Sequence, residues 1–231
     1  MRIALVIAGG KGTRMDLNLP KQFYHIQGKP IFIHTLEVFE RCKHIDRIVL
    51  VTLKDWIDTA YVYCRKHNIT KLDNIVAGGD SNHASIHNGL LYLENNYNND
   101  DMIMIHAANR PIINNQLILD NIKTYDEFGN AMTATPCYEV SFFCSENKTK
   151  LIPRENLFQT QTPQSISLEK LKYLHKEAKA RNIEGASTCE LLYQLNEEIF
   201  FSKGSTSNIK VTTNEDLRIL EYYLNRRKDL E

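Results

Sequence analysis

The sequence predicts an α/β fold in which a Rossmann-like, doubly wound and mostly parallel sheet carries a protruding β-hairpin arm. Short apolar runs alternate with amphipathic stretches of helical spacing, the first apolar run passes into a glycine-rich turn, and one β-prone segment breaks the alternation. Alternating strands and helices favour a parallel sheet with right-handed crossovers. In such sheets, ligands bind beyond the carboxyl ends of the strands.

The predicted elements follow one another along the whole chain. The apolar runs predict strands over Ile3–Ile7, Ile45–Thr52, Asn74–Val76, Met102–Ile105, Ala131–Thr135 and Ile199–Ser202. The stretches between them predict helices over Ile31–Arg41, Lys54–His67, Ala84–Asn95, Gln116–Phe128, Leu168–Ala180 and Glu215–Arg226. Because no repeat or linker interrupts the alternation, we expect one domain over residues 1–231.

The segment that breaks the alternation predicts the arm, at about residues 137–157. Cys137–Cys144 is β-prone, Ser145–Lys150 is a polar turn, and the strand pattern then resumes. A lone hairpin is marginally stable in water, and this one would expose Phe142 and Phe143. We therefore expect the arm to pack on a partner subunit.

Composition excludes several classes of protein. The 28 basic and 28 acidic residues cancel, and no basic run is present, which disfavours nucleic acid and acidic membranes as partners. The first apolar run is too short for a signal peptide or a membrane span. The five cysteines are scattered and form no CxxC pair, so we expect reduced thiols and a cytoplasmic protein.

The segment from Ala8 to Phe23 is the most informative part of the sequence. Gly9, Gly10 and Gly12 let backbone N–H groups approach a polyanion that a Cβ would hold off. Arg14 and Lys21 place two cations beside the same turn. The glycine spacing fits neither the P-loop nor the dinucleotide fingerprint. The segment predicts a different phosphate-binding loop; an ordinary glycine turn is the alternative.

Several motifs, in order, resemble the cytidylyltransferases that act on 2-C-methyl-D-erythritol 4-phosphate and their relatives that act on D-ribitol 5-phosphate. The resemblance runs from Ile3 to about Leu224. The matching motifs are Ala8–Met15, Pro20–Phe23, Gly28–Pro30, Gly78–Asp80, Ser85, Arg110–Pro111, Gln161–Gln164 and Asn208–Thr212. The resemblance implies a nucleotidyltransferase domain that forms a homodimer through its arm.

The implied reaction is attack of a substrate phosphate oxygen on the α-phosphorus of CTP, with pyrophosphate as the leaving group. Because two anions meet, positioning and cationic stabilisation supply most of the catalysis. The resemblance implies catalytic roles for three residues. Arg14 would clamp phosphate, Lys21 would lie near the leaving group, and Lys210 near the attacking phosphate.

The resemblance also implies binding residues for both substrates. Those for CTP are Ala8, Gly9, Gly10, Lys11, Gly12, Thr13, Gly79, Asp80 and Ser85. Those for the phosphorylated acceptor are Arg110, Thr162 and Arg154. Of these, Arg154 would reach the site of the neighbouring subunit. We expect Mg²⁺ to be held largely by the CTP phosphates and water, with protein ligands unknown.

The sequence departs from the family pattern mainly in the acceptor half of the site. Ala107 stands where the family has an aspartate, Asn109 replaces a small apolar residue, and Asn82 stands where an arginine is usual. The customary Thr-Asp pair is replaced at about Ala186–Ser187. The motifs for CTP are largely retained.

Two classes of function are consistent with this pattern. The first is a CTP-dependent enzyme that makes a CDP-alditol for a surface polymer from a ribitol 5-phosphate-like acceptor, because Lys29–Glu37 and Gln161–Ser165 resemble the ribitol branch more closely. Its runner-up is the 2-C-methyl-D-erythritol 4-phosphate enzyme of isoprenoid synthesis. The second class is a catalytically silent nucleotide-binding dimer, suggested by Ala107. Retention of the cations favours the enzyme.

Overall fold

The computed structural model describes residues 1–10, 19–146, 148–183, 185 and 187–228. The strands are β1 (Arg2–Ala8), β2 (His25–Ile26), β3 (Lys29–Pro30), β4 (Arg47–Thr52), β5 (Leu72–Ala77), β6 (Met102–Ala107), β7 (Asn130–Pro136), β8 (Ser141–Ser145), β9 (Lys148–Ile152), β10 (Phe158–Ser167) and β11 (Phe201–Lys203). The helices are α1 (Ile31–Arg41), α2 (Ile57–Lys66), α3 (Asn82–Asn96), α4 (Asn115–Phe128), α5 (Leu168–Ala180), α6 (Thr188–Gln194) and α7 (Asn214–Lys228), with short 3₁₀ helices η1 (Lys21–Phe23), η2 (Lys54–Trp56) and η3 (Arg154–Asn156).

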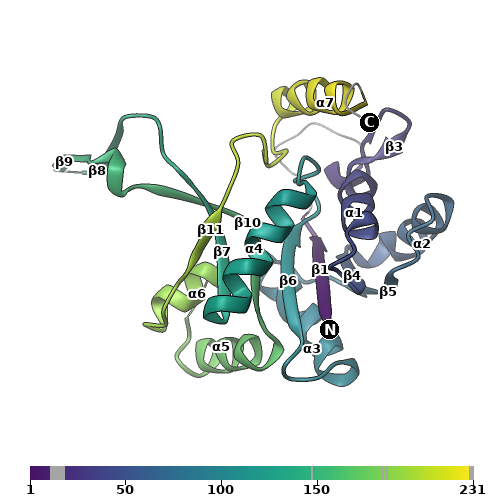
Figure 1. Cartoon of the computed structure of the whole chain (residues 1–231), viewed down its shortest axis with the longest axis horizontal. Helices are drawn as coiled ribbons and strands as arrows, with labels where there is room; N and C mark the ends of the chain where they lie inside the picture. The colour runs from purple at the N-terminus through teal and green to yellow at the C-terminus, as the bar shows by residue number, and fades with distance from the viewer. Residues whose placement is uncertain (11–18, 147, 184, 186, 229–231) are drawn as a thin grey trace.

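The described strands build a seven-stranded central sheet in the order β11-β7-β10-β6-β1-β4-β5. β1 pairs in parallel with β6 and β4, β4 with β5, and β7 with β11. β10 lies between β6 and β7 and is antiparallel to both. The predicted mostly parallel sheet is confirmed (Figure 1).

Helices cover both faces of this sheet, because successive side chains of a strand point to opposite faces. On β1, Ala4 and Val6 join the core formed with α1, α2 and α4. Ile3 and Leu5 join the core formed with α3, α5 and α6. This alternation confirms the doubly wound arrangement. Among the described helices, none combines the length and apolar composition needed to cross a membrane.

Short polar residues define where several helices begin. Ser81, Asn114, Ser167 and Ser187 precede α3, α4, α5 and α6, and each side chain accepts a backbone N–H from the first turn. Such caps satisfy donors that have no partner within the helix. α4 ends at Gly129, whose φ of 81° is readily adopted only by glycine.

Some predicted boundaries were wrong. The helix predicted over Lys54–His67 is interrupted, because η2 precedes α2 and Trp56 packs on Phe23 with ring centroids 4.4 Å apart. β4 begins at Arg47, two residues after the predicted start at Ile45. β10 and α6 were not predicted. β10 is rich in Gln and Thr and lacks an apolar alternation, and the seven residues of α6 are too few to show a helical period.

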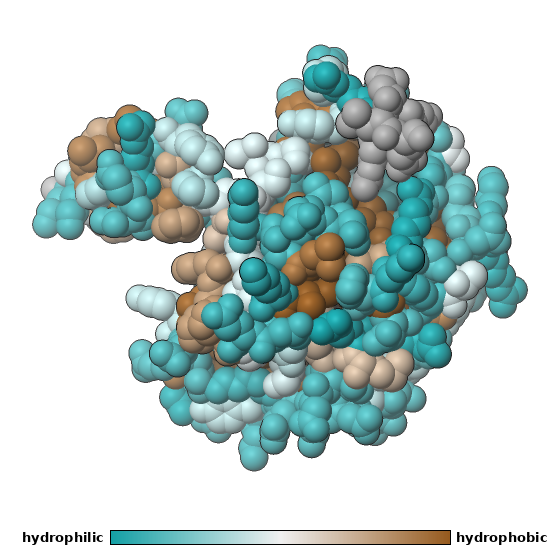
Figure 2. Space-filling model, viewed as in Figure 1, coloured by the Kyte–Doolittle hydropathy of each residue, from teal (hydrophilic) through white to brown (hydrophobic). Residues whose placement is uncertain are grey.

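The arm is confirmed as an antiparallel hairpin that extends away from the body of the molecule (Figure 1). Its first strand starts at Ser141 instead of Cys137, and its turn is tighter than predicted because Ser145 pairs with Lys148. Phe142 and Phe143 are 55% and 56% exposed. The space-filling view shows apolar residues on the arm, apart from the core (Figure 2).

Three histidines stack where α3 and α5 meet. The His175 ring lies 4.7 Å from the His83 ring and 5.6 Å from the His87 ring. His175 is buried, and neither of its ring nitrogens has a hydrogen-bond partner. Burial, reinforced by the two neighbouring histidines, lowers the pKa of His175 to about 3. The His175 imidazole is therefore neutral at physiological pH.

Candidate active site

The glycine loop begins at the carboxyl end of β1. Ala8 and Gly10 line a pocket there. Gly9 instead approaches Ser85 in the first turn of α3, since a Cβ added to Gly9 would lie 2.6 Å from Ser85 Oγ. The rest of the predicted loop, Lys11, Gly12, Thr13 and Arg14, lies outside the described residues.

Lys21 reaches the same place from η1. The next two residues anchor that short helix: Gln22 donates from Nε2 to the Ala8 carbonyl at 2.5 Å, and Phe23 is buried against Phe32, with ring centroids 5.0 Å apart. A 3₁₀ turn held at two consecutive residues keeps its first residue in place. Lys21 is therefore fixed relative to the end of β1.

These elements enclose a pocket of about 260 Å³ at the carboxyl ends of β1 and β6. Lys21 and Lys210 both line it, although they are far apart in sequence. No acidic side chain belongs to its described lining, to which Lys21 and Lys210 contribute the two charged side chains. The described lining residues are Ile7, Ala8, Gly10, Lys21, Gln22, Asn82, Ala107, Ala108, Asn109 and Lys210.

The turn after β5 is held by Ser85, which is 1% exposed. Its Oγ accepts the Gly79 N–H at 3.2 Å and lies 3.4 Å from the Gly79 carbonyl. A Cβ on Gly79 would lie 2.5 Å from the Ala84 Cβ, so the turn has no room for a side chain there. Asp80, next to this turn, is exposed. The predicted role of these residues in CTP binding stays a prediction.

Two of the predicted acceptor residues are connected through Asn208. Arg110 Nη1 donates to the Asn208 carbonyl at 2.6 Å, and Asn208 Nδ2 donates to the Thr162 carbonyl at 2.8 Å. Thr162 Oγ1 in turn accepts the Ala107 N–H at 3.2 Å. Burial lowers the pKa of Arg110 to about 10, which leaves its guanidinium charged at neutral pH. Both residues thus support the walls around the pocket.

Arg154 lies elsewhere in this chain. It is exposed, begins η3 at the base of the arm, and does not belong to the described lining of the pocket. Its predicted role in the site of a neighbouring subunit stays a prediction.

His106 is buried in the sheet at the end of β6. Burial lowers its pKa to about 3, so the ring is neutral at physiological pH. Its Nε2 lies 3.2 Å from the Arg110 carbonyl and donates to it, and the ring meets Phe39 edge-on. His106 therefore supports the loop that follows β6, and does not exchange protons in the pocket.

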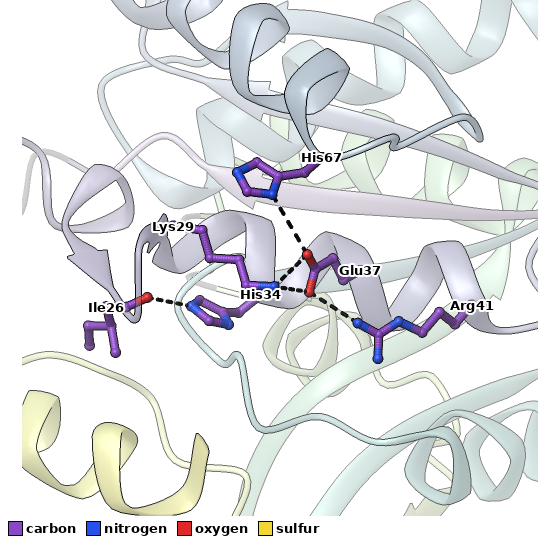
Figure 3. A network of polar contacts seen from close by, with 6 residues as sticks. All are labelled: Ile26, Lys29, His34, Glu37, Arg41 and His67. Atoms are coloured by element: carbon purple, nitrogen blue, oxygen red, sulfur yellow. Dashed lines mark hydrogen bonds and ion pairs between the residues drawn. The ribbon is translucent and has the colours of Figure 1, made fainter. Parts of the chain in front are cut away.

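Lys29, although part of a family-like motif, is directed into an ion-pair network away from the pocket. Its ammonium lies 2.6 Å from both carboxylate oxygens of Glu37, which also contacts Arg41 at 3.3 Å and His67 at 4.0 Å (Figure 3). The desolvation of His67 by burial lowers its pKa and outweighs the effect of Glu37. The network joins β3, α1 and the end of α2.

The described residues do not assemble a metal-binding cluster. Among them, no group of three or more His, Cys, Asp or Glu side chains is arranged to hold a metal. At the pocket, Ala107 supplies a methyl group and no carboxylate. Hard cations such as Mg²⁺ bind oxygen ligands. The described part of the pocket therefore supplies no carboxylate to hold Mg²⁺.

Sequence reasoning assigned no functional role to three polar residues that line the pocket. Gln22 lies within a motif, where its contact with a strand carbonyl is invisible from sequence. Asn82 and Asn109 were recognised only as departures from a pattern. Asn109 carried one usable signal: it is an amide side chain in a loop that directly follows a buried strand.

The chain is similar to known proteins over nearly its whole length. The sequence profile of IspD, 2-C-methyl-D-erythritol 4-phosphate cytidylyltransferase, matches residues 2–226. The ribitol-5-phosphate cytidylyltransferase of Lacticaseibacillus paracasei is 37% identical over 100% of both chains. The 2-C-methyl-D-erythritol 4-phosphate cytidylyltransferase of Clostridium botulinum is 33% identical over 96% of this chain and 99% of that protein.

Solved structures show the same fold. The 4-diphosphocytidyl-2C-methyl-D-erythritol synthase of Anaerococcus prevotii superposes with a TM-score of 0.84 at 24% identity, over 97% of this chain and 98% of that one. The Francisella tularensis 2-C-methyl-D-erythritol 4-phosphate cytidylyltransferase superposes with a TM-score of 0.78 at 24% identity, over 96% and 99%. The profile match across nearly the whole chain and the full-length relatives establish that this protein belongs to the IspD family of cytidylyltransferases.

Proposed function

We propose that this protein couples CTP to ribitol 5-phosphate, or to a closely similar polyol phosphate, giving a CDP-alditol and pyrophosphate. The observation that carries the proposal is the pocket in which Lys21 and Lys210 meet the start of the glycine loop at the ends of β1 and β6. The 37% identity with a ribitol-5-phosphate cytidylyltransferase over the full chain supports the choice of acceptor.

The chemistry is a displacement at the α-phosphorus of CTP. An acceptor phosphate oxygen forms a new P–O bond, the bond from the α-phosphorus to the bridging oxygen breaks, and pyrophosphate leaves. Lys21 offsets the charge that develops on the leaving group, and Lys210 draws the acceptor phosphate toward the α-phosphorus. In this proposal Arg14 is the third catalytic cation and clamps phosphate, and Arg110 and Thr162 bind the acceptor. Mg²⁺, when bound, would be held by the CTP phosphates and water and would neutralise part of the phosphate charge.

A pyrophosphate-release assay tests the proposal. The panel contains ribitol 5-phosphate, 2-C-methyl-D-erythritol 4-phosphate and other polyol phosphates, each with CTP and Mg²⁺. Lys21→Ala and Lys210→Ala should each lower kcat about 10²-fold or more, as the loss of a group that stabilises transition-state charge commonly does. Lys172→Ala, which removes a lysine on α5 away from the described pocket lining, is the matched control. Turnover of no acceptor by the parent protein would contradict the proposal.

A second function has one observation in its favour. Ala107 belongs to the pocket lining, and no acidic side chain is among the described lining residues. If catalysis requires a carboxylate at that position, the protein is a catalytically silent nucleotide-binding dimer. In that case CTP binds with an affinity that Mg²⁺ does not increase, and Ala107→Asp creates activity. For an active enzyme adapted to Ala107, the same substitution leaves turnover unchanged or lowers it. Calorimetry and the pyrophosphate assay together separate the two functions.

The proposal includes a cytoplasmic homodimer. The exposed aromatic residues of the arm, Phe142 and Phe143, support it, because solvent-exposed apolar surface of this kind is favoured at subunit contacts. Arg154, close to the arm in sequence, then contributes to the partner's acceptor site. Sedimentation velocity at micromolar concentration provides the direct measurement, and a monomer would contradict this part of the proposal.

A further inference from the structure

Lys210 belongs to a segment that has no regular secondary structure to position it. Residues 204–213, between β11 and α7, form neither helix nor strand. Lys210 itself is exposed, whereas Asn208 and Val211 on either side are 0% exposed. The backbone around the lysine is therefore held in part through Asn208, two residues before it, and Val211, directly after it.

Asn109 holds Val211 by hydrogen bonds to both the N–H and the carbonyl of Val211. Asn109 Nδ2 donates to the Val211 carbonyl at 2.6 Å, and the Val211 N–H donates to the Asn109 carbonyl at 2.9 Å. Val211 also packs in an apolar cluster with Ile31 and Leu220. Asn109 is 7% exposed, so water does not readily replace its amide. Asn109 thus ties the loop after β6 to the residue that follows Lys210, once through its side chain and once through its backbone.

Asn208, on the other side, is tied to different elements. Its Nδ2 donates to Gln161 Oε1 at 3.1 Å and to the Thr162 carbonyl at 2.8 Å, and its own carbonyl accepts from Arg110. Asn208 is held by several partners, whereas the bond to the Val211 carbonyl is made by the Asn109 side chain.

From this geometry we infer that Asn109 is a positioning residue, which holds Lys210 at the pocket for the transfer reaction. The inference rests on the proposed function, because it requires that Lys210 take part in catalysis. It assigns Asn109 an indirect role. Loss of its amide leaves the buried Val211 carbonyl without that donor, and Lys210 shifts, while the backbone bond from the Val211 N–H remains. A displacement of about 1 Å can lower a rate about 10²-fold.

A double-mutant cycle tests whether Asn109 acts through Lys210. Pyrophosphate release is measured for the parent protein, Asn109→Ala, Lys210→Ala and the double variant. We expect Asn109→Ala to lower kcat about tenfold or more and to change the CTP dissociation constant by less than about threefold. In the Lys210→Ala background, Asn109→Ala should have little further effect, because the group it positions is gone.

The matched control is Asn130→Ala. Asn130 is also buried, and its Nδ2 also donates to a backbone carbonyl, that of Glu198 at 3.0 Å, but it lies on β7 outside the described pocket lining. It should lower the melting temperature and leave kcat within about twofold of the parent. If Asn109→Ala does not fold, Asn109→Ser, which keeps a shorter polar side chain, replaces it in the cycle.

Hydrogen exchange supplies a readout that does not depend on activity. The peptide covering residues 205–213 should exchange faster in Asn109→Ala than in the parent, and should be unchanged in Asn130→Ala. Unchanged exchange in Asn109→Ala would overturn the inference, as would additive effects on kcat in the cycle. If the parent turns over no acceptor, the proposed function fails, and the exchange data then decide by themselves whether Asn109 holds this segment.

Discussion

Substituting Gly9 with alanine tests how the two halves of the predicted CTP site fit together. A Cβ at Gly9 would lie 2.6 Å from Ser85 Oγ and 3.4 Å from Ser85 Cβ. A separation of 2.6 Å between a carbon and a hydroxyl oxygen is far inside van der Waals contact, and Ser85 is buried with its Oγ engaged by Gly79. Either the serine or the loop must move.

The expected cost follows from these contacts. Overpacking of a close-packed site costs about 1–3 kcal/mol, and displacement of Ser85 adds about 1 kcal/mol for its lost hydrogen bond to Gly79. We expect the free energy of unfolding of Gly9→Ala to fall by about 2–4 kcal/mol and CTP binding to weaken. Gly10→Ala is the matched control, because a Cβ there meets no atom within 4 Å. Its stability should stay within about 1 kcal/mol of the parent.

Urea unfolding followed by circular dichroism measures the stability, and calorimetry measures CTP binding. Combining Gly9→Ala with Ser85→Ala removes the oxygen at 2.6 Å and leaves the ordinary 3.4 Å contact with Cβ. The double variant should therefore be more stable than the sum of the two single effects predicts, by about 1 kcal/mol or more. Equal stabilities of Gly9→Ala and Gly10→Ala, or strict additivity with Ser85→Ala, would refute this reasoning.

Three further predictions concern pH, an ion pair and the dimer. The pKa of His175 falls from 6.5 to about 3 on folding, so its contribution to stability is complete above pH 6.5 and is lost as the pH falls toward 3. In urea unfolding, the stability of His175→Leu should therefore fall less steeply with acid than that of the parent, by about 1.4 kcal/mol per pH unit in that window. An unchanged slope would contradict the assigned cause. Glu37→Gln leaves the half-buried ammonium of Lys29 without its carboxylate partner. The free energy of unfolding should fall by about 1–3 kcal/mol, while kcat stays close to the parent value. A urea midpoint equal to that of the parent would show that the network does not contribute to stability. If the proposed site is shared between subunits, mixing inactive Lys21→Ala and Arg154→Ala protomers should restore part of the pyrophosphate release, and verified mixed dimers without activity would place Arg154 outside the partner's site.

Local pattern was sufficient for most of the fold. β1 and α1 were predicted nearly to their observed ends, because one is a continuous apolar run that stops at glycines and the other has an apolar face behind a proline. The same reasoning failed for β10, whose Gln and Thr side chains carry no hydrophobic period. That strand is specified by pairing with β6 and β7 on both sides, a long-range property that no window of sequence contains.

The sequence by itself therefore determined the class of fold, the family and the chemical types in the site: glycines, lysines and small residues in recognisable motifs. The tertiary structure alone decided which of them meet. It brings Lys210 to Lys21 across most of the chain, directs Lys29 into an ion pair with Glu37, and makes Asn109 the donor to the Val211 carbonyl. The physical reason is that a side chain's role depends on its burial and on its partners, and both arise only when distant segments pack together.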